Sequence, residues 1–269
     1  MNRNLFISTL AFKKYPIGKI LRLIKKNNLD GIDLAPLTIF KSWSQFENNV
    51  FNLKRRLIKN KIRINAMQGI FFGWKTNLFY SSNDEILKIT SHLKKIIRIC
   101  KFLNVKKIVI GSSYFRKKKG MSLKQSDKKF IAFFSKLKIY LKKNNVTLCL
   151  EAIPRKYGED YIYNIDHLAS MIKKINSNKI RINFDSSLFH FKKFNFTFFY
   201  KYRKIIKNLQ ISQKYFKNFN KISSNNLKFS KSLKPISNFK DISLEMILDN
   251  PSSLEINKSI RNFKKYFKN

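Results

Sequence analysis

Residues 107–154 carry the pattern that decides the fold: KIVIGSSYFRKKKGMSLKQSDKKFIAFFSKLKIYLKKNNVTLCLEAIP. An apolar run rich in β-branched residues begins the stretch at Lys107–Ser112, and a second such run ends it at Thr147–Pro154. The segment between them, 123–145, has the longer apolar spacing that is typical of a helix. Two short runs joined by a helix predict one unit of a parallel α/β sheet.

The same alternation continues along the whole chain, with strands about 34 residues apart, close to the ~30 expected of one strand–helix unit. The pattern therefore predicts an α/β protein whose residues 1–269 form a single (β/α)8 barrel domain. A doubly wound open sheet is the second choice, but no glycine-rich fingerprint follows the first strand. The expected strands are Leu5–Phe12, Gly31–Pro36, Arg63–Ile70, Lys107–Ser112, Thr147–Pro154, Ile180–Ser186, Asn208–Ser212 and Ile242–Ile247.

One stretch departs from this rhythm. Residues 213–240 read QKYFKNFNKISSNNLKFSKSLKPISNFK, which is polar, basic and weakly periodic. A loop of this length is usually a lid or disordered, and this one follows the seventh strand. We therefore expect an irregular, lid-like loop over the catalytic end of the barrel.

The composition is strongly basic. With 57 Lys and Arg against 15 Asp and Glu, the formal net charge is +42. Lysine runs recur from end to end, and Asn, Ile and Phe are enriched together with Lys. This joint bias favours compositional drift in an A+T-rich genome, and a selected polyanion-binding surface is the alternative. Either origin predicts weak, salt-sensitive, non-specific binding of nucleic acid.

Several classes of protein are disfavoured. A hydrophobic fraction of 43% argues against wholesale disorder, and no apolar run reaches the ~18 residues of a membrane span. The start of the chain, MNRNLFISTLAFKK, resembles a first strand more than a signal peptide. Cys100 and Cys149 are expected to be buried, reduced thiols, which favours a cytoplasmic protein without membrane partners.

Carboxylates stand where three predicted strands end: Glu151 in LCLE, Asp185 in INFD and Glu245 in ISLE. A buried carboxylate requires a cation, a metal or a hydrogen-bond cage. At one barrel mouth the three would form an oxygen-rich pocket suited to Mg²⁺ or Mn²⁺. The alternative is that a nearby Lys or Arg neutralises each one separately.

These segments resemble the sugar phosphate isomerase/epimerase group of the xylose-isomerase-like TIM barrels. In that group, strands five to eight supply metal ligands from LEP-type, LDTG-type, HxHxSE-type and IEM-type segments. LCLEAIPRKYG, INFDSSL and ISLEM match three of these segments, and they supply Glu151, Asp185 and Glu245. Further matches are ISTLAF, GIDLAP, AMQGIFFG and VIGSSYFR at the first four strands.

The chain departs from the group at the seventh strand. NLQIS places Gln210 where the group has its His ligand, and Gln213 replaces the Glu that often follows. The implied metal ligands are therefore Glu151, Asp185, Gln210 and Glu245. An amide oxygen suits Mn²⁺ or Mg²⁺ better than the softer Co²⁺ or Zn²⁺, although these remain alternatives. Loss of catalysis is the other interpretation.

Other side chains are candidates for substrate binding. The predicted contacts are Gln68, Arg116, Tyr157 and His190. The bland alternatives are packing for Gln68 and Tyr157, and a solvated basic loop for Arg116. Asp33 is expected either to line the pocket or to cap a loop. His92 and His167 are interpreted as surface or packing residues.

The resemblance implies a metal-dependent isomerase or epimerase of a sugar or sugar phosphate, in which Glu151 and Glu245 exchange a proton as base and acid. A non-catalytic or decayed carbohydrate-binding barrel is the second hypothesis, and Gln210 favours it. An endonuclease-IV-like nucleic-acid enzyme is the third, but such chemistry uses several histidines and this chain has 3. The sequence is also compatible with a homo-oligomer.

Overall fold

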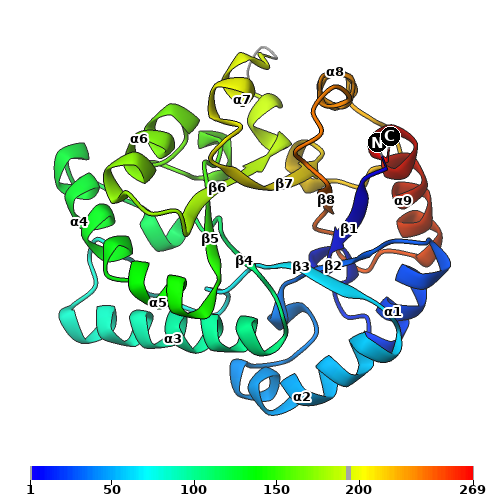
Figure 1. Ribbon diagram of the computed structural model, residues 1–269, viewed down its shortest axis with the longest axis horizontal. Coiled ribbons are helices and arrows are strands. Elements are labelled where there is room, and N and C mark those ends of the chain that lie inside the picture. Colours follow the sequence, from blue (N-terminus) through cyan, green and yellow to red (C-terminus); the bar gives the residue numbers. More distant parts are fainter. Residues whose placement is uncertain (1, 192–194, 269) are drawn as a thin grey trace. The chain divides into compact units, whose positions relative to one another are not determined.

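The computed structural model describes residues 2–191 and 195–268, and its strands form one closed parallel barrel. The strands follow one another around the barrel in chain order, which confirms the predicted (β/α)8 barrel (Figure 1). Their bounds are β1 Asn4–Ser8, β2 Gly31–Leu34, β3 Arg63–Met67, β4 Lys107–Ile110, β5 Thr147–Glu151, β6 Ile180–Asp185, β7 Ile206–Ser212 and β8 Asp241–Glu245.

Helices follow the strands along the chain. Several begin at a serine whose hydroxyl accepts a backbone N–H of the first turn, and Ser82 and Ser122 complete capping boxes with Glu85 and Gln125. The helices are α1 Ile17–Lys26, α2 Trp43–Lys59, α3 Asn83–Phe102, α4 Leu123–Ser135, α5 Lys138–Asn144, α6 Ile165–Ile175, α7 Thr197–Tyr202, α8 Ser224–Leu233 and α9 Ser253–Phe267.

The chain divides into two compact units. Unit 1 consists of Met1–Gln68, Asp185–Thr197 and Asn208–Asn269, and unit 2 consists of Gly69–Phe184 and Phe198–Lys207. Both units contain several chain segments, because each strand pairs with strands that are distant in sequence. Most of the predicted site residues lie in unit 1, whereas Glu151, Arg116 and Tyr157 lie in unit 2.

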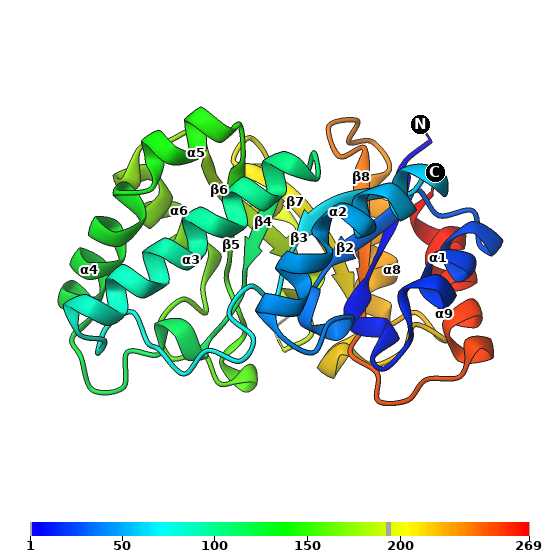
Figure 2. The same cartoon turned by 90° about the horizontal axis from the view of Figure 1, so that it is seen from below.

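In unit 1, parallel pairing joins β8 to β1, β1 to β2, β2 to β3 and β7 to β8. The two ends of the chain lie together, since the Arg3 N–H donates to the Lys268 carbonyl at 2.9 Å (Figure 1). Helices α1 and α9 lie side by side (Figure 2), and Asn27 after α1 donates to Asn257 on α9. These contacts hold the first and last elements of unit 1 together.

In unit 2, β5 pairs with both β4 and β6. Helix α3 lies beside α5, and α4 lies beside α6 (Figure 2). An aromatic cluster fills the space beneath α4, with the rings of Phe130 and Phe134 4.6 Å apart and Tyr161 edge-on to both Phe79 and Phe130. Aromatic burial of this kind is a large contribution to the hydrophobic core.

Two predicted segments differ from the structure. The helix expected over 123–145 is two helices, α4 and α5; Leu137 between them is buried, and so is Leu141 in α5. The irregular loop expected over 213–240 contains α8. Phe229 and Leu233 are fully buried on one face of α8, but the surrounding Ser, Asn and Lys residues conceal this spacing in the sequence.

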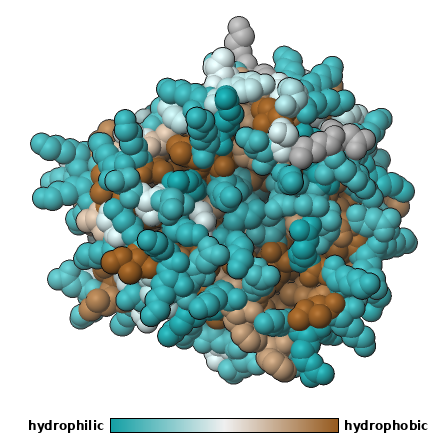
Figure 3. Space-filling model, in the orientation of Figure 1, coloured by the Kyte–Doolittle hydropathy of each residue, from teal (hydrophilic) through white to brown (hydrophobic). Residues whose placement is uncertain are grey.

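The surface is predominantly hydrophilic. Figure 3 shows polar side chains over most of the visible face, with small, scattered hydrophobic groups. Among the described residues, no helix is long and apolar enough to cross a membrane. Cys100 and Cys149 are buried, as predicted, and neither forms a disulfide within the described part of the chain; burial raises the pKa of the Cys100 thiol.

Candidate active site

Asp185 is the most enclosed of the predicted carboxylates. It ends β6, is 0% exposed, and accepts hydrogen bonds at Oδ1 from Ser212 Oγ and the Ser187 N–H, both at 2.6 Å. Among the described residues, Asp185 Oδ2 has no hydrogen-bond partner. Burial raises the pKa of this carboxyl, and the bonds from Ser212 and Ser187 oppose that rise. Asp185 therefore has one oxygen fixed and one available.

Ser212 connects the ends of three strands. Its hydroxyl binds Asp185, and its backbone is in register with Glu245 on β8. Paired residues on neighbouring strands present their side chains to the same face of the sheet. Asp185 and Glu245 therefore flank Ser212 in unit 1, and both are buried.

His190 reaches the same serine. Its Nε2 lies 2.7 Å from the Ser212 carbonyl oxygen. Burial lowers the pKa of His190, while the Ser212 carbonyl and Asp185 raise it. A half-buried imidazole beside a buried carboxylate is consistent with the predicted substrate contact, which stays a prediction.

Gln210 is fully buried two residues before Ser212, on the same face of β7. Its Nε2 donates to Gln68 Oε1 at 2.6 Å and to Asp33 Oδ2 at 3.3 Å. Gln68 Nε2 in turn donates to Glu245 Oε1 at 3.4 Å and to the Ser8 hydroxyl. The predicted ligand Gln210 and the predicted substrate contact Gln68 thus belong to one buried chain of polar groups that runs from Asp33 to Glu245.

Sequence reasoning missed part of this polar interior. Asn65 Nδ2 donates to Asp33 Oδ1 at 2.7 Å and to Asn208 Oδ1 at 3.2 Å, and both asparagines are buried. The signal was present in β7, where Asn208, Gln210 and Ser212 alternate with apolar residues. Strict alternation in a strand whose outer face is covered indicates a polar inner face.

Glu151, in unit 2, ends β5 and is 7% exposed. Its Oε2 accepts a hydrogen bond of 2.9 Å from Asn183 Nδ2, the residue paired with it on β6. Gly111 leaves space on the other side, because a Cβ atom there would lie 2.4 Å from Glu151 Oε2. The carboxylate therefore occupies a space that only glycine at position 111 provides.

Arg116 is not solvated, so its interpretation as part of a solvated basic loop is wrong. It is 0% exposed, its Nη2 lies 2.7 Å from Glu159 Oε2, and its Nη2 also donates to the Glu151 carbonyl oxygen at 2.7 Å. A buried guanidinium requires such a partner, which the sequence spacing does not reveal. Contact with substrate stays a prediction for Arg116 and for half-buried Tyr157, which ends the short turn Arg155–Tyr157 after β5.

The other two histidines have packing roles, as the sequence suggested. His92 Nε2 lies 2.8 Å from the Ile70 carbonyl, and its ring contacts Trp74. His167 Nε2 lies 2.9 Å from Asp127 Oδ1, and its ring makes a T-shaped contact with the ring of Tyr161. Both belong to unit 2 and bind groups of the protein itself.

The donor set of unit 1 suits a hard cation better than a soft one. Asp185 offers a buried oxygen without a hydrogen-bond partner, and Glu245 is a second buried carboxylate. Magnesium is commonly held by one or two carboxylates together with water. In the part of the chain that the structure describes, no group of three or more His, Cys, Asp or Glu side chains is placed to hold a metal. The predicted fourth ligand, Glu151, lies in unit 2.

Comparison with known proteins supports the fold. The family model described as "xylose isomerase-like TIM barrel" matches residues 21–265. Comparison with curated proteins finds no significant match.

Solved structures of similar fold cover nearly the whole chain. D-psicose 3-epimerase in the presence of D-fructose is similar at a TM-score of 0.81 and 9% identity, over 100% of both chains. The apo form of 3-keto-D-glucoside 4-epimerase from E. coli is similar at 0.78 and 13% identity, over 98% of this chain and 99% of that one. The IolI protein with a bound zinc atom is similar at 0.75 and 14% identity, over 100% of both chains. At these identities the likeness shows the fold.

Proposed function

The chain belongs to the xylose isomerase-like TIM barrel family, and on this premise we propose that it is a sugar isomerase or epimerase. The observation that carries the proposal is the arrangement around Ser212, which has buried Asp185 on one side and buried Glu245 on the other. Buried carboxylates at strand ends are expected of a catalytic centre in this fold. The similar epimerase structures support the same reaction class.

The reaction requires a base beside a carbon that carries a slightly acidic C–H next to a carbonyl group. Removal of that proton and its return to the neighbouring carbon is isomerisation, and its return to the opposite face of the same carbon is epimerisation. We assign Glu245 as one acid/base group, because its Oε1 accepts a hydrogen bond from the buried Gln68 amide, which positions it. We assign Glu151 as the second acid/base group, because its segment resembles the corresponding segment of the family.

A divalent cation, Mn²⁺ or Mg²⁺ first and Co²⁺ or Zn²⁺ second, would supply polarisation of the substrate carbonyl. In unit 1, Asp185 through Oδ2 and Glu245 would hold it. Ser212 and the Ser187 N–H keep Asp185 Oδ1 in place, so that its other oxygen has a defined direction. His190 and Gln68 would bind substrate hydroxyl groups.

The decisive test is exchange of a sugar C–H proton with solvent. We expect the protein with added Mn²⁺ to incorporate deuterium from D₂O at the carbon next to the carbonyl of a ketose such as D-fructose, as measured by NMR. Glu245→Gln and Glu151→Gln should each lower the exchange rate by about 10²-fold or more, because the amide cannot accept the proton. Asp84→Asn, an exposed carboxylate on α3, is the matched control.

A non-catalytic carbohydrate-binding barrel gives the opposite result. It would bind the sugar without any deuterium incorporation, and the two glutamine variants would match the parent protein. If deuterium exchange persists in both folded variants, the two carboxylates take no part in the proton transfer.

A further inference from the structure

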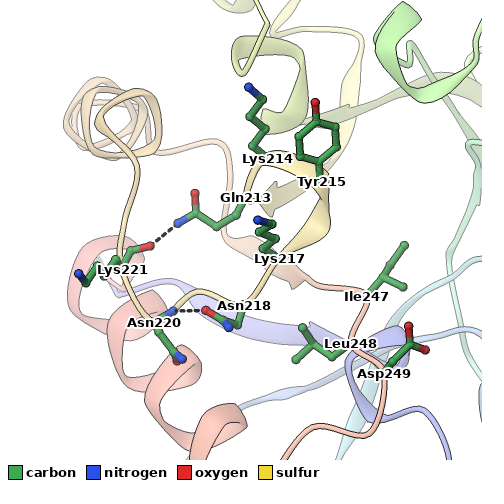
Figure 4. Close-up of a pocket in the computed structure, with 10 residues that line it drawn as sticks. All are labelled: Gln213, Lys214, Tyr215, Lys217, Asn218, Asn220, Lys221, Ile247, Leu248 and Asp249. Carbon is green, nitrogen blue, oxygen red and sulfur yellow. Dashed lines mark hydrogen bonds between the residues drawn. The ribbon is translucent and has the colours of Figure 1, made fainter.

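A hollow of about 550 Å³ lies beside the carboxyl ends of β7 and β8 in unit 1. Residues 213–221 form one side of it and residues 247–249 the other (Figure 4). Its volume is within the range of small-molecule sites. None of the predicted site residues lines it.

The hollow adjoins the proposed catalytic centre through the chain itself. Gln213 directly follows Ser212, and Ile247 comes two residues after Glu245. The Ile247 N–H donates to the Phe216 carbonyl at 2.9 Å, which joins the two sides. In barrels of this fold, the loops after strands seven and eight are a frequent place for a phosphate group.

The backbone on the β7 side is strained. Tyr215 and Phe216 both have left-handed conformations, with φ of 57° and 53°. Such a conformation is unfavourable for non-glycine residues and occurs preferentially at functional sites. The two residues carry the turn that sets Lys214 and Lys217 on either side of them.

The charge of the hollow is positive. Lys214, Lys217 and Lys221 line it, and Lys217 and Lys221 have no ion-pair partner among the described residues. The acidic residue of the lining, Asp249, is paired with Lys13, and that contact lowers the pKa of the Asp249 carboxyl. Asp249 therefore does little to neutralise the three lysines.

All three lysines are exposed, and Lys217 is the one drawn nearest the middle of the lining. Figure 4 shows its side chain between Gln213 and the Ile247–Leu248 segment, whereas the ammonium groups of Lys214 and Lys221 point outwards. The Lys214 ammonium lies over the rings of two aromatic residues. An anion held by Lys217 would thus have two further flexible cations at its rim.

Two of the amide side chains of the hollow, those of Asn218 and Gln213, are already engaged. Asn218 Nδ2 donates to Glu255 at 2.7 Å, and Asn218 Oδ1 accepts the Asn220 N–H. Gln213 donates to the Lys221 carbonyl. The lysines are therefore the cationic groups available for a ligand, which favours an anion over a neutral sugar. Ile247, Leu248 and half-exposed Tyr215 add an apolar surface for a carbon chain.

We propose that this hollow binds the phosphate group of a sugar phosphate substrate, with Lys217 as the principal contact and Lys214 as the second. The sugar carbons would extend from Lys217 past Ile247 towards Glu245. This assignment rests on the proposed function and narrows its substrate class from a sugar to a sugar phosphate.

Calorimetric titration at fixed ionic strength tests the site, with inorganic phosphate as the probe. Lys217→Ala should weaken phosphate binding about tenfold and Lys214→Ala/Lys217→Ala about a hundredfold, whereas Lys217→Arg should stay within about threefold of the parent. Lys25→Ala, an exposed lysine at the end of α1, is the matched control and should change nothing. D-fructose 6-phosphate should bind at least tenfold more tightly than D-fructose, and Lys217→Ala should remove that preference.

Equal phosphate binding by the parent and Lys217→Ala would overturn the assignment. Equal weakening in Lys25→Ala would also overturn it, because the general positive field would then account for binding. The two proposals can fail independently. Deuterium exchange into D-fructose without phosphate binding would contradict only the phosphate site. Phosphate binding without exchange into either sugar would contradict only the proposed enzymatic activity.

Discussion

At the scale of single residues, Gln210 distinguishes this chain from the group that its segments resemble. The amide is fully buried and donates to both Gln68 and Asp33. It therefore supports the side chain that contacts Glu245, in addition to any part in metal binding. Replacement of an imidazole by an amide is compatible with a hard cation, because an amide oxygen is a ligand that Mg²⁺ and Mn²⁺ accept.

Gln210→His tests that role. Imidazole is a better ligand than an amide for Co²⁺ and Zn²⁺ and gains little for Mg²⁺. We expect about tenfold tighter Co²⁺ or Zn²⁺ binding, or ~1.4 kcal/mol, with Mg²⁺ affinity nearly unchanged. Titration of the metal-free protein with each ion measures this. An unchanged preference in a folded variant would show that residue 210 serves only the hydrogen-bond chain to Gln68.

At the scale of secondary-structure elements, the close approach of β4 and β5 is what holds Glu151. These strands are in register from Lys107 with Thr147 to Ile110 with Leu150, so that Gly111 and Glu151 are opposite each other where the strands end. The Glu151 carboxylate fills the space that a Cβ atom at position 111 would occupy. The absence of a side chain at Gly111 therefore sets where the proposed catalytic carboxylate of Glu151 lies.

Gly111→Ala should displace that carboxylate. The added Cβ would lie 2.4 Å from Glu151 Oε2, and overpacking of this kind costs about 1–3 kcal/mol of unfolding free energy. We expect a lower thermal midpoint together with lost deuterium exchange. Gly120→Ala is the matched control, since nothing lies within 4 Å of its added Cβ, and it should change stability by less than about 0.5 kcal/mol. Full activity and stability of Gly111→Ala would mean that the carboxylate moves freely.

At the scale of the whole molecule, a net charge of +42 dominates the electrostatic field. The lysines are spread along the entire sequence, and Figure 3 shows hydrophilic side chains over most of one face. Such a field attracts any polyanion, a sugar phosphate included, without specifying one. Local arrangement, as at Lys217, is needed for specificity.

Nucleic-acid binding should therefore be blind to sequence and weak at physiological salt. Affinity for polynucleotides should decrease about 10³-fold or more between 50 and 200 mM salt, because binding releases condensed counterions. Fluorescence anisotropy with labelled oligonucleotides of different sequence measures this. Tight binding of one nucleic-acid structure at 150 mM salt would instead favour a selected nucleic-acid surface.

The order of the elements and three strand-end carboxylates could be read directly from the sequence. Short apolar runs rich in β-branched residues, helical spacing between them and regular intervals depend on local chemistry, which is why the barrel was predicted and then observed. Glu151, Asp185 and Glu245 were found because few acidic residues occur and because a strand end is a local feature. Dependence on local patterns also explains a failure: the apolar face of α8 was missed because its polar neighbours in the sequence conceal the spacing.

Only the tertiary structure decided which side chains meet. That Arg116 is enclosed by Glu159, that Gln210 donates to Gln68, and that Glu151 occupies the space left by Gly111 are contacts between residues tens to more than a hundred positions apart. Strand pairing brings these groups together, and burial then favours a partner for most polar atoms, with Asp185 Oδ2 as an exception. The identity of a residue sets what it can bind, whereas the register of its neighbours sets what it does bind.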